Sequence, residues 1–515
     1  MTQANSWSRG YPVDESYPAS WHYFQSPAWL RAICAVSGVA WEVDASTPLS
    51  ICEVGCGIGY TANLLAAAQP QSQVVGLDYN PAHIAEARSL ARAAGLGNTQ
   101  FLEVDLADLD DASLAALPEF DLIMAHGVWS WVGDPVRKGV LRLIQRRLKP
   151  GGLVLMTYNC LPGAAGSLGL ARLVRPFLAS DPDSTRALGR AGDLVRRIFA
   201  AEPSHLGRSG WSRLLTGEQT GARSGYLRHE FQTEHWRPEF FADVAEAMQS
   251  VRCDYVGSAT IDENFPAMSL TPAQLAIWEE VGDPATRELI FDLCVQRAFR
   301  RDVYVRGLRR IDRVAATRAL QIASVDRSDA PLVLHTQAGE AKLPEEMIRQ
   351  IRSRLAQGPQ TIGDLRSLPG CGSATPEELA AMLLGSRTAE PVWRDPDSAG
   401  DEAEAQRRVR RFHQASAARL APYGVGHGSL GLGAPLLGGV ISASALELAI
   451  VGALADLAAE PDVAGADDAD LAGRIAQRLL PPGPPPDSAT LGGLMQAIQD
   501  TLRDRAPIWR SLGIL

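Results

Sequence analysis

The sequence predicts an α/β fold in which a mainly parallel sheet carries helices on both faces. Short apolar segments alternate with helix-forming segments between positions 49 and 158. The first apolar segment runs directly into a glycine-rich loop, and a helix-forming stretch follows that loop. Parallel strands need such crossover helices, and a glycine loop after the first strand is typical of nucleotide-cofactor sites.

The glycine loop follows the strand predicted at 49–54. Gly55, Gly57 and Gly59 stand at alternate positions, where the missing Cβ lets the backbone turn tightly and approach a ligand. The dinucleotide pattern is GxGxxG and presents a helix N-terminus to a pyrophosphate. Here the spacing is GxGxG with Glu53 two residues ahead, as in class I S-adenosylmethionine (SAM) methyltransferases. An acid suits SAM, because that cofactor carries a cationic sulfonium and an amino-acid tail.

Acids at the ends of the next two strands complete the predicted SAM site. Asp78 ends the second strand, 19 residues after the last glycine (78 − 59 = 19), where its carboxylate can accept both ribose hydroxyls. Asp105 ends the third strand and suits the adenine amino group. Three further residues at strand ends are assigned to the same pocket: Tyr79, Leu106 and His126.

The fourth and fifth strands, predicted at 120–126 and 151–158, lead to the substrate mouth. Aromatic faces attract cations, and polar groups at a strand end are costly unless they are used. For each tryptophan alone, hydrophobic packing is the favoured alternative. The residues predicted to hold the nucleophile are Tyr158, Asn159, His126 and His229, and those predicted to contact the substrate are Trp129, Trp131 and Tyr23.

Six regions are predicted along the chain. They are an aromatic-rich lid (1–48), the SAM-binding core (49–160), a helical insertion that shapes the substrate cleft (161–230), the completion of a seven-stranded sheet (231–310), a winged-helix-like domain (311–400) and a helical C-terminal domain (401–515). An equal alternative for the lid is that its aromatics only pack the first helix against the sheet. In the winged-helix-like domain the third helix begins with Glu377 and Glu378, which would repel phosphate, so docking or packing is favoured over DNA binding.

Composition limits the partners. The 515 residues carry a formal net charge of −10 and a pI near 5.5, so there is no global basic field to attract nucleic acid. The most apolar late stretch, 436–459, is interrupted by Glu447 and Asp456 and predicts a buried helix, with no membrane insertion. A homodimer is left open.

The cysteines and the N-terminus predict a cytoplasmic protein. Seven cysteines, an odd and scattered set, suit a reducing compartment, and the first residues have no apolar core like that of a secretory signal. Cys52 and Cys56 flank the glycine loop without histidines or other cysteines at ligand spacing, so small packing residues are a better interpretation than zinc ligands, and no metal is expected.

Five groups of residues together form a more particular pattern: Glu53–Gly57, His126–Val132, Tyr158–Asn159 with Pro162–Gly163, His229–Glu230 with Pro238 and Phe240–Phe241, and Asp292 with Phe299–Arg301. In these residues the chain resembles bacterial SAM-dependent methyltransferases that carry a methyltransferase regulatory domain, a group that includes protein-lysine methyltransferases acting on outer-membrane proteins. The resemblance covers most of the chain. This chain departs from the family pattern at Trp129, Cys160–Leu161 and Ala164, which bears on the substrate and not on the reaction.

The resemblance implies a Rossmann-like class I methyltransferase sheet and methyl transfer from SAM to lysine side chains of a protein or peptide substrate. One alternative is a methyltransferase of a small molecule or a peptide natural product. The other is a catalytically silent SAM-binding scaffold that binds a partner through the winged-helix-like region.

Overall fold

The computed structural model describes most of the chain. The described residues are 18–43, 47–204, 206–207, 209–217, 224–327, 330–336, 338–393, 402–420, 429–458, 468–480 and 487–515. The first seventeen residues of the predicted lid lie outside this set.

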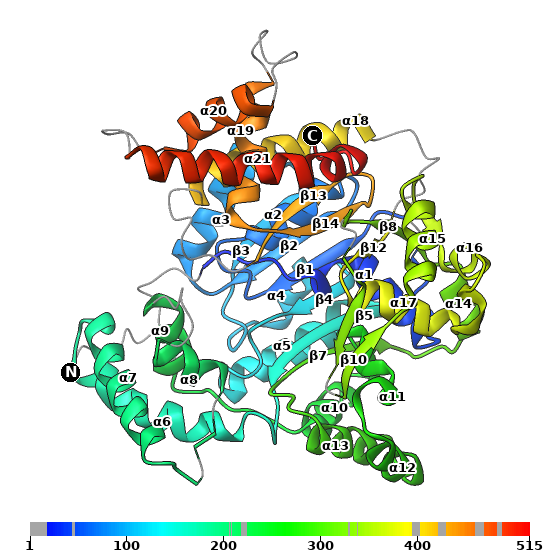
Figure 1. Cartoon of the computed structure of the whole chain (residues 1–515). Coiled ribbons are helices and arrows are strands. Elements are labelled where there is room, and N and C mark those ends of the chain that lie inside the picture. The colour runs from blue at the N-terminus through cyan, green and yellow to red at the C-terminus, as the bar shows by residue number, and fades with distance from the viewer. Residues whose placement is uncertain are drawn as a thin grey trace.

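A seven-stranded sheet forms the centre of the molecule and confirms the predicted fold class (Figure 1). Its strand order is β3-β2-β1-β4-β5-β7-β6, and β7 runs antiparallel to its neighbours β5 and β6. The strands are β1 Ser50–Val54, β2 Gln73–Asp78, β3 Thr99–Glu103, β4 Phe120–Ala125, β5 Leu148–Asn159, β6 Cys253–Ser258 and β7 Phe299–Arg306. From β1 the chain first builds the sheet in one direction, through β2 and β3, and then in the other, from β4. Such a switch point is where a crevice is expected at the carboxyl ends of the strands.

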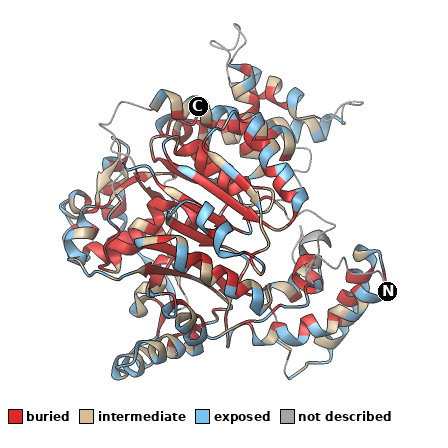
Figure 2. Cartoon of the chain, turned by 180° about the vertical axis from the view of Figure 1, so that it is seen from behind, coloured by how far each residue is buried: buried red, intermediate tan, exposed pale blue. Residues whose placement is uncertain are grey.

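Both faces of this sheet are covered, which explains why its strands are apolar almost throughout (Figure 2). Ile51 and Leu155 pack on one face, and their neighbours Cys52 and Met156 pack on the other. The first face is covered by α1 Pro27–Val36, α2 Tyr60–Ala68 and α3 Pro81–Ala93, and the second by α4 Asp111–Ala116, α5 Asp134–Arg147 and α10 Phe241–Gln249.

Helical segments interrupt the chain on either side of β6. The described part of the predicted insertion forms four helices, α6 Ala165–Ser180, α7 Ser184–Ala200, α8 Gly210–Leu215 and α9 Ser224–Gln232. They share a separate hydrophobic core, to which Trp131 and Trp236 also belong. Between β6 and β7 the chain forms α11 Pro266–Ser269, α12 Pro272–Glu280 and α13 Pro284–Cys294. Both groups lie at the lower edge of the molecule in Figure 1.

The region 311–393 contains helices in the predicted order, but the winged-helix assignment stays a prediction. A three-stranded sheet of order β11-β8-β12 packs beside them. The elements are α14 Arg313–Arg318, β8 Gln321–Ser324, β9 Val333–Thr336, β10 Gly339–Lys342, α15 Glu345–Leu355, β11 Gln360–Thr361, α16 Ile362–Arg366, α17 Pro376–Gly385 and β12 Ala389–Pro391.

The C-terminal region is mainly helical, which confirms the prediction for 401–515, and it also contains two strands that were not predicted. Besides α18 Glu402–Leu420, α19 Ala445–Leu457, α20 Asp468–Leu479 and α21 Ser488–Ser511, it contains a hairpin of β13 Leu430–Ala434 and β14 Gly439–Ala443. Two of the five residues of β13 are glycines and all five are buried, so it lacks the apolar–polar alternation that marks a strand. The hairpin packs on α2, where Tyr60 Oη donates to the Gly431 carbonyl at 3.1 Å. In the described part of the chain, no helix is long and apolar enough to cross a membrane.

Candidate active site

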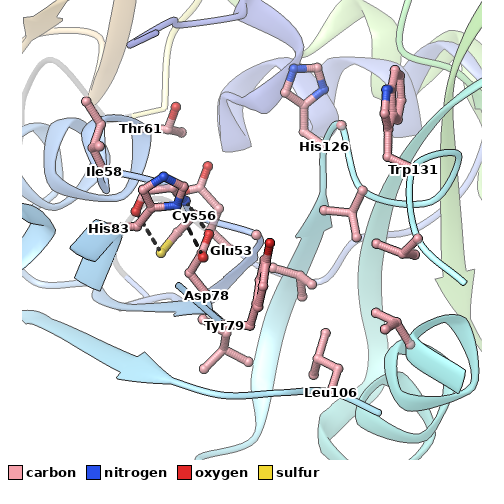
Figure 3. Close-up of a pocket in the computed structure, with 18 of the residues that line it drawn as sticks. Glu53, Cys56, Ile58, Thr61, Asp78, Tyr79, His83, Leu106, His126 and Trp131 are labelled. Carbon is pink, nitrogen blue, oxygen red and sulfur yellow. Dashed lines mark hydrogen bonds and ion pairs between the residues drawn. The ribbon is translucent and has the colours of Figure 1, made fainter. Parts of the chain in front are cut away.

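A cavity of about 570 Å³ lies at the carboxyl ends of β1, β2 and β4, as the prediction for the cofactor requires (Figure 3). Most of the residues predicted to bind SAM line it, namely Glu53, Gly55, Gly57, Asp78, Tyr79, Asp105, Leu106 and His126. The cavity wall also includes His22 and Gln25 from the segment before α1, and His235 from the loop before α10.

The three glycines of the loop share a positive φ but differ in what surrounds them. Gly57 has φ +52°, and a Cβ there would meet nothing within 4 Å, so this residue leaves backbone open to the cavity. At Gly59 a Cβ would lie 2.5 Å from Ala87 Cβ, so this glycine lets α3 pack closely. Gly59 is not among the residues that line the cavity. Gly59 therefore has a packing role, whereas Gly55 and Gly57 line the cavity, where ligand contact was predicted for all three.

Asp78 joins the glycine loop to the end of β2. Its Oδ2 accepts the Gly57 N–H at 2.8 Å, and its Oδ1 accepts the Asn80 N–H at 2.9 Å and lies 3.3 Å from His83 Nδ1. Each carboxylate oxygen has two acceptor sites, so Oδ2 can still accept a hydroxyl from the cavity. This geometry suits the ribose role predicted for Asp78.

Glu53 provides the test of whether the cavity fits SAM. Its side chain is buried, lines the cavity, and its Oε2 has no hydrogen-bond partner in the described residues. Burial raises the pKa of Glu53 to about 8, and the Asp78 carboxylate adds to this, while hydrogen bonds from the Ala62 backbone and the Gln25 side chain oppose it. A buried, unpaired carboxyl oxygen is costly unless a cation pairs with it. The ammonium of SAM is such a cation, so the residues present fit this cofactor.

SAM affinity is expected to rise with pH between about 6 and 8 and then level off. Below its pKa of about 8 the Glu53 carboxyl of the free protein is protonated, and it must lose that proton to pair with the ammonium of SAM. Binding at pH 7 should therefore release a proton, which calorimetry in buffers of different ionisation enthalpy would measure. Glu53→Gln is the control, because its binding should release no such proton. Equal proton release by both proteins would contradict the assignment.

His126 lies on the opposite side of the cavity from Asp78 (Figure 3). Thr157 Oγ1 accepts the Gly127 N–H at 3.0 Å and lies 2.9 Å from His126 Nδ1. Thr157 is fully buried, and among the described residues Nδ1 is the remaining partner for its hydroxyl hydrogen. We therefore assign the ring hydrogen of His126 to Nε2, which makes this nitrogen a donor.

His22, which the sequence reasoning missed, stands against His126 with ring centroids 4.6 Å apart. Burial lowers the pKa of His126 well below its usual value, and His22 and Arg301 add to this effect. Burial and Arg301 likewise lower the pKa of His22 to about 4. Both imidazoles are therefore neutral at physiological pH. No local motif marks His22, because only the folded chain brings the segment before α1 to the end of β4.

The structure places Tyr158 and Asn159 outside the cavity wall. Tyr158 is fully buried on the opposite face of β5 from Thr157, and its hydroxyl donates to Asp302 Oδ2 at 2.6 Å. The Oδ1 of Asn159 accepts the indole N–H of Trp236 at 2.8 Å. Both polar groups are used, as expected at this strand end, but by protein partners.

Of the remaining residues predicted to contact the substrate or hold the nucleophile, one lines the cavity and three do not. Trp131 lines the cavity, whereas Trp129 is buried and its indole N–H donates to Glu239. Tyr23 packs against Trp29 and under the Arg387 guanidinium, and it does not line the cavity. His229 is buried in α9, also outside the cavity wall. Of the predicted acceptor-side residues, the structure thus brings only His126 and Trp131 to the cavity.

Two family models match the chain. One, described as a methyltransferase domain, matches residues 46–175, and the other, described as a predicted methyltransferase regulatory domain, matches residues 223–306. The solved structure of PKMT2 from Rickettsia typhi in complex with AdoHcy has the same fold, with a TM-score of 0.66 at 17% sequence identity. That similarity covers 97% of this chain and 99% of PKMT2.

Relatives by sequence include proteins without an assigned activity and named methyltransferases. An uncharacterised protein of Synechocystis sp. is 29% identical over 70% of this chain and 72% of its own length. The trans-aconitate 2-methyltransferase of Acidovorax ebreus is 34% identical, but over only 27% of this chain and 47% of that enzyme. The glycine loop, the acids at the strand ends and these matches agree. The chain is a SAM-dependent methyltransferase in which a methyltransferase domain is combined with a methyltransferase regulatory domain.

Proposed function

We propose that this methyltransferase modifies lysine side chains of a protein substrate. The observation that carries the proposal is the extent of the fold similarity to PKMT2, a protein-lysine methyltransferase of Rickettsia. The similarity spans the helical insertion and the C-terminal regions as well as the SAM-binding core. The trans-aconitate and malonyl-acyl-carrier-protein methyltransferases align over 22 to 45% of this chain.

The chemistry of the cavity favours a substrate amine that is uncharged when it enters. The carboxylates of the cavity, Glu53, Asp78 and Asp105, lie at or just beyond the ends of β1, β2 and β3, on the side predicted to bind the cofactor. On the other side, His22 and His126 are neutral, and Trp131 adds an apolar ring. A lysine ammonium has a reference pKa of about 10.4, and apolar, neutral surroundings disfavour its charge. Entry of the amine would therefore be coupled to loss of its proton to solvent.

SAM supplies the methyl group, and the residues of the chain supply alignment and exclusion of water. The nitrogen lone pair of a neutral amine must point at the methyl carbon, so it is not available to accept a hydrogen bond. His126, with its hydrogen on Nε2, is a donor and would not remove a proton from the amine. We infer that it donates to an oxygen atom of the substrate or the cofactor and so helps to fix the direction of approach.

Methyl-labelled SAM, incubated with the protein and a bacterial lysate, is expected to label protein bands as N-methyl-lysine. Acid hydrolysis identifies the labelled amino acid, and Asp78→Asn serves as the control that should not label. The chain itself has only three lysines, Lys138, Lys149 and Lys342, so replacing them with arginine separates self-labelling from true substrates. Label that is lost on mild base treatment would indicate carboxyl esters and contradict lysine methylation.

Methylation of a small carboxylic acid is the second candidate. The 34% identity with trans-aconitate 2-methyltransferase over 27% of this chain favours it. The positive charge of Arg301, which acts on both His22 and His126, would also favour an anionic acceptor. In the labelling experiment this function would place label in the small-molecule fraction. SAM binding without any turnover would support a scaffold instead.

A further inference from the structure

The segment 233–239, which we call the clasp, connects α9 to α10 and lies within the match to the regulatory domain model. It runs beside two loops of the SAM-binding core, the loop 126–133 after β4 and the loop 159–163 after β5. Arg237 N–H donates to the Ser130 carbonyl at 2.9 Å, and Glu239 N–H donates to the Asn159 carbonyl at 3.1 Å. The clasp therefore fixes the two loops relative to each other through backbone bonds.

Side chains reinforce these backbone bonds. Thr233 Oγ1 donates to the Trp131 carbonyl at 3.2 Å, and Trp236 Nε1 donates to Asn159 Oδ1 at 2.8 Å. Thr233 is fully buried and Trp236 nearly so. The Thr233 hydroxyl and the Trp236 indole N–H are both paired, so a shift of the clasp would leave a buried donor without its acceptor.

The carboxylate of Glu239 is the charged centre of this arrangement. Its Oε2 accepts the indole N–H of Trp129 at 2.5 Å, and its Oε1 accepts Arg137 Nη1 at 2.5 Å. Arg137 is buried, in the first turns of α5, and its guanidinium lies 5.3 Å from the Trp129 ring centroid. One carboxylate thus ties the middle of the loop 126–133 to the helix that follows it.

The same loop forms a wall of the SAM cavity. Val128 and Trp131 line the cavity; Val128 directly precedes Trp129 in the sequence, and Trp131 follows two residues after it. Val128 also packs tightly on the glycine loop, since a Cβ on Gly55 would come within 2.6 Å of Val128 Cγ2. A displacement of Trp129 would therefore move the wall that faces the cofactor.

We propose that Glu239 is a positioning residue for methyl transfer, through which the regulatory domain sets the cavity wall by holding Trp129 and Arg137. The regulatory domain then completes the active site of the same chain. This inference depends on the methyltransferase activity and not on the identity of the acceptor, so it stands whether the substrate is a protein or a small molecule.

Glu239→Ala is expected to weaken SAM binding by about 10-fold and to lower kcat by about 10- to 100-fold, because a shift of about 1 Å at a reacting centre costs rates of this order. Glu239→Gln should lose less, since its amide oxygen can still accept the Trp129 N–H while the charge toward Arg137 is gone. The matched control is Glu234→Ala, an exposed acid of the clasp that should leave both constants unchanged. Calorimetry with SAM and steady-state turnover measure these effects.

A double-mutant cycle separates positioning from general stabilisation. Trp129→Phe keeps an aromatic side chain and removes the indole N–H, and Glu239→Ala removes its acceptor. Combining these two changes should therefore cost much less in SAM affinity than the sum of the two single changes. Additive losses would overturn the proposal. It would equally be overturned if Glu239→Gln lowered the unfolding temperature of the free protein but kept wild-type SAM affinity and kcat at a temperature where it is folded.

Discussion

Replacing Asp78 with alanine is expected to weaken SAM binding by about 3 kcal/mol, or roughly 150-fold, because hydrogen bonds to a charged group contribute about 1.5–3 kcal/mol each. The change removes the acceptor of the Gly57 N–H, which holds the glycine loop, as well as the carboxylate predicted to bind the ribose. It also leaves the Asn80 N–H without its acceptor at the start of α3. Calorimetry with SAM and with its demethylated product would measure the loss.

Glu103→Ala is the matched control for this substitution. Glu103 ends β3, lies directly beside Asp78 in the sheet register, and is exposed outside the cavity wall. Its removal should leave SAM affinity within about twofold of wild type. A variant Asp78→Ala that stays folded by circular dichroism and binds SAM with wild-type affinity would refute the assignment of this carboxylate to the cofactor.

Arg300→Met is expected to give the largest loss of stability, about 3–5 kcal/mol, because it leaves the buried Asp302 carboxylate without its counter-charge and leaves Asp292 paired with Arg297 alone of its two arginines. Arg300 is fully buried, with Nη1 2.8 Å from Asp292 Oδ2 and Nε 3.0 Å from Asp302 Oδ2. Glu288 approaches Nη2 to 2.6 Å, and the Tyr158 hydroxyl donates to Asp302. This network occupies the side of β5 that carries Tyr158, opposite the side that carries Thr157.

The loss should grow as pH rises. Burial raises the pKa of both Asp292 and Asp302 even with the arginine present, and without it their folded-state pKa values rise further. A carboxyl whose pKa is higher in the folded than in the unfolded state loses stability as pH rises from the unfolded to the folded value. Denaturant midpoints at pH 5 and pH 8 would test this.

Arg309→Met serves as the control, because Arg309 pairs with Glu42 at the surface, where ion pairs contribute about 0–1 kcal/mol. Equal shifts of the midpoint for the two variants would contradict a special role for the buried network. The network also explains why a tyrosine stands at position 158: its hydroxyl provides Asp302 with a buried donor.

The cofactor half of the site could be predicted from the sequence because its signals are local. A strand, a glycine turn and an acid are consecutive residues, and each acid stands where an apolar strand ends. The connection between Glu53, Asp78 and Asp105 then follows from the rule that parallel strands present their carboxyl ends to one crevice. The fold of the sheet followed from the same periodic pattern, including the two distant strands β6 and β7.

The acceptor half was decided by tertiary structure. Both faces of the sheet are buried, so the sequence of β5 has no polar alternation to show which face each side chain takes. In the folded chain Thr157 contacts His126, while its neighbour Tyr158 points to Asp302 on the other face of the sheet. The residues that complete this half come from positions 22 and 239, which no local pattern connects. The sequence by itself determined what is built from consecutive residues, and only folding could determine contacts between segments that are far apart in the chain.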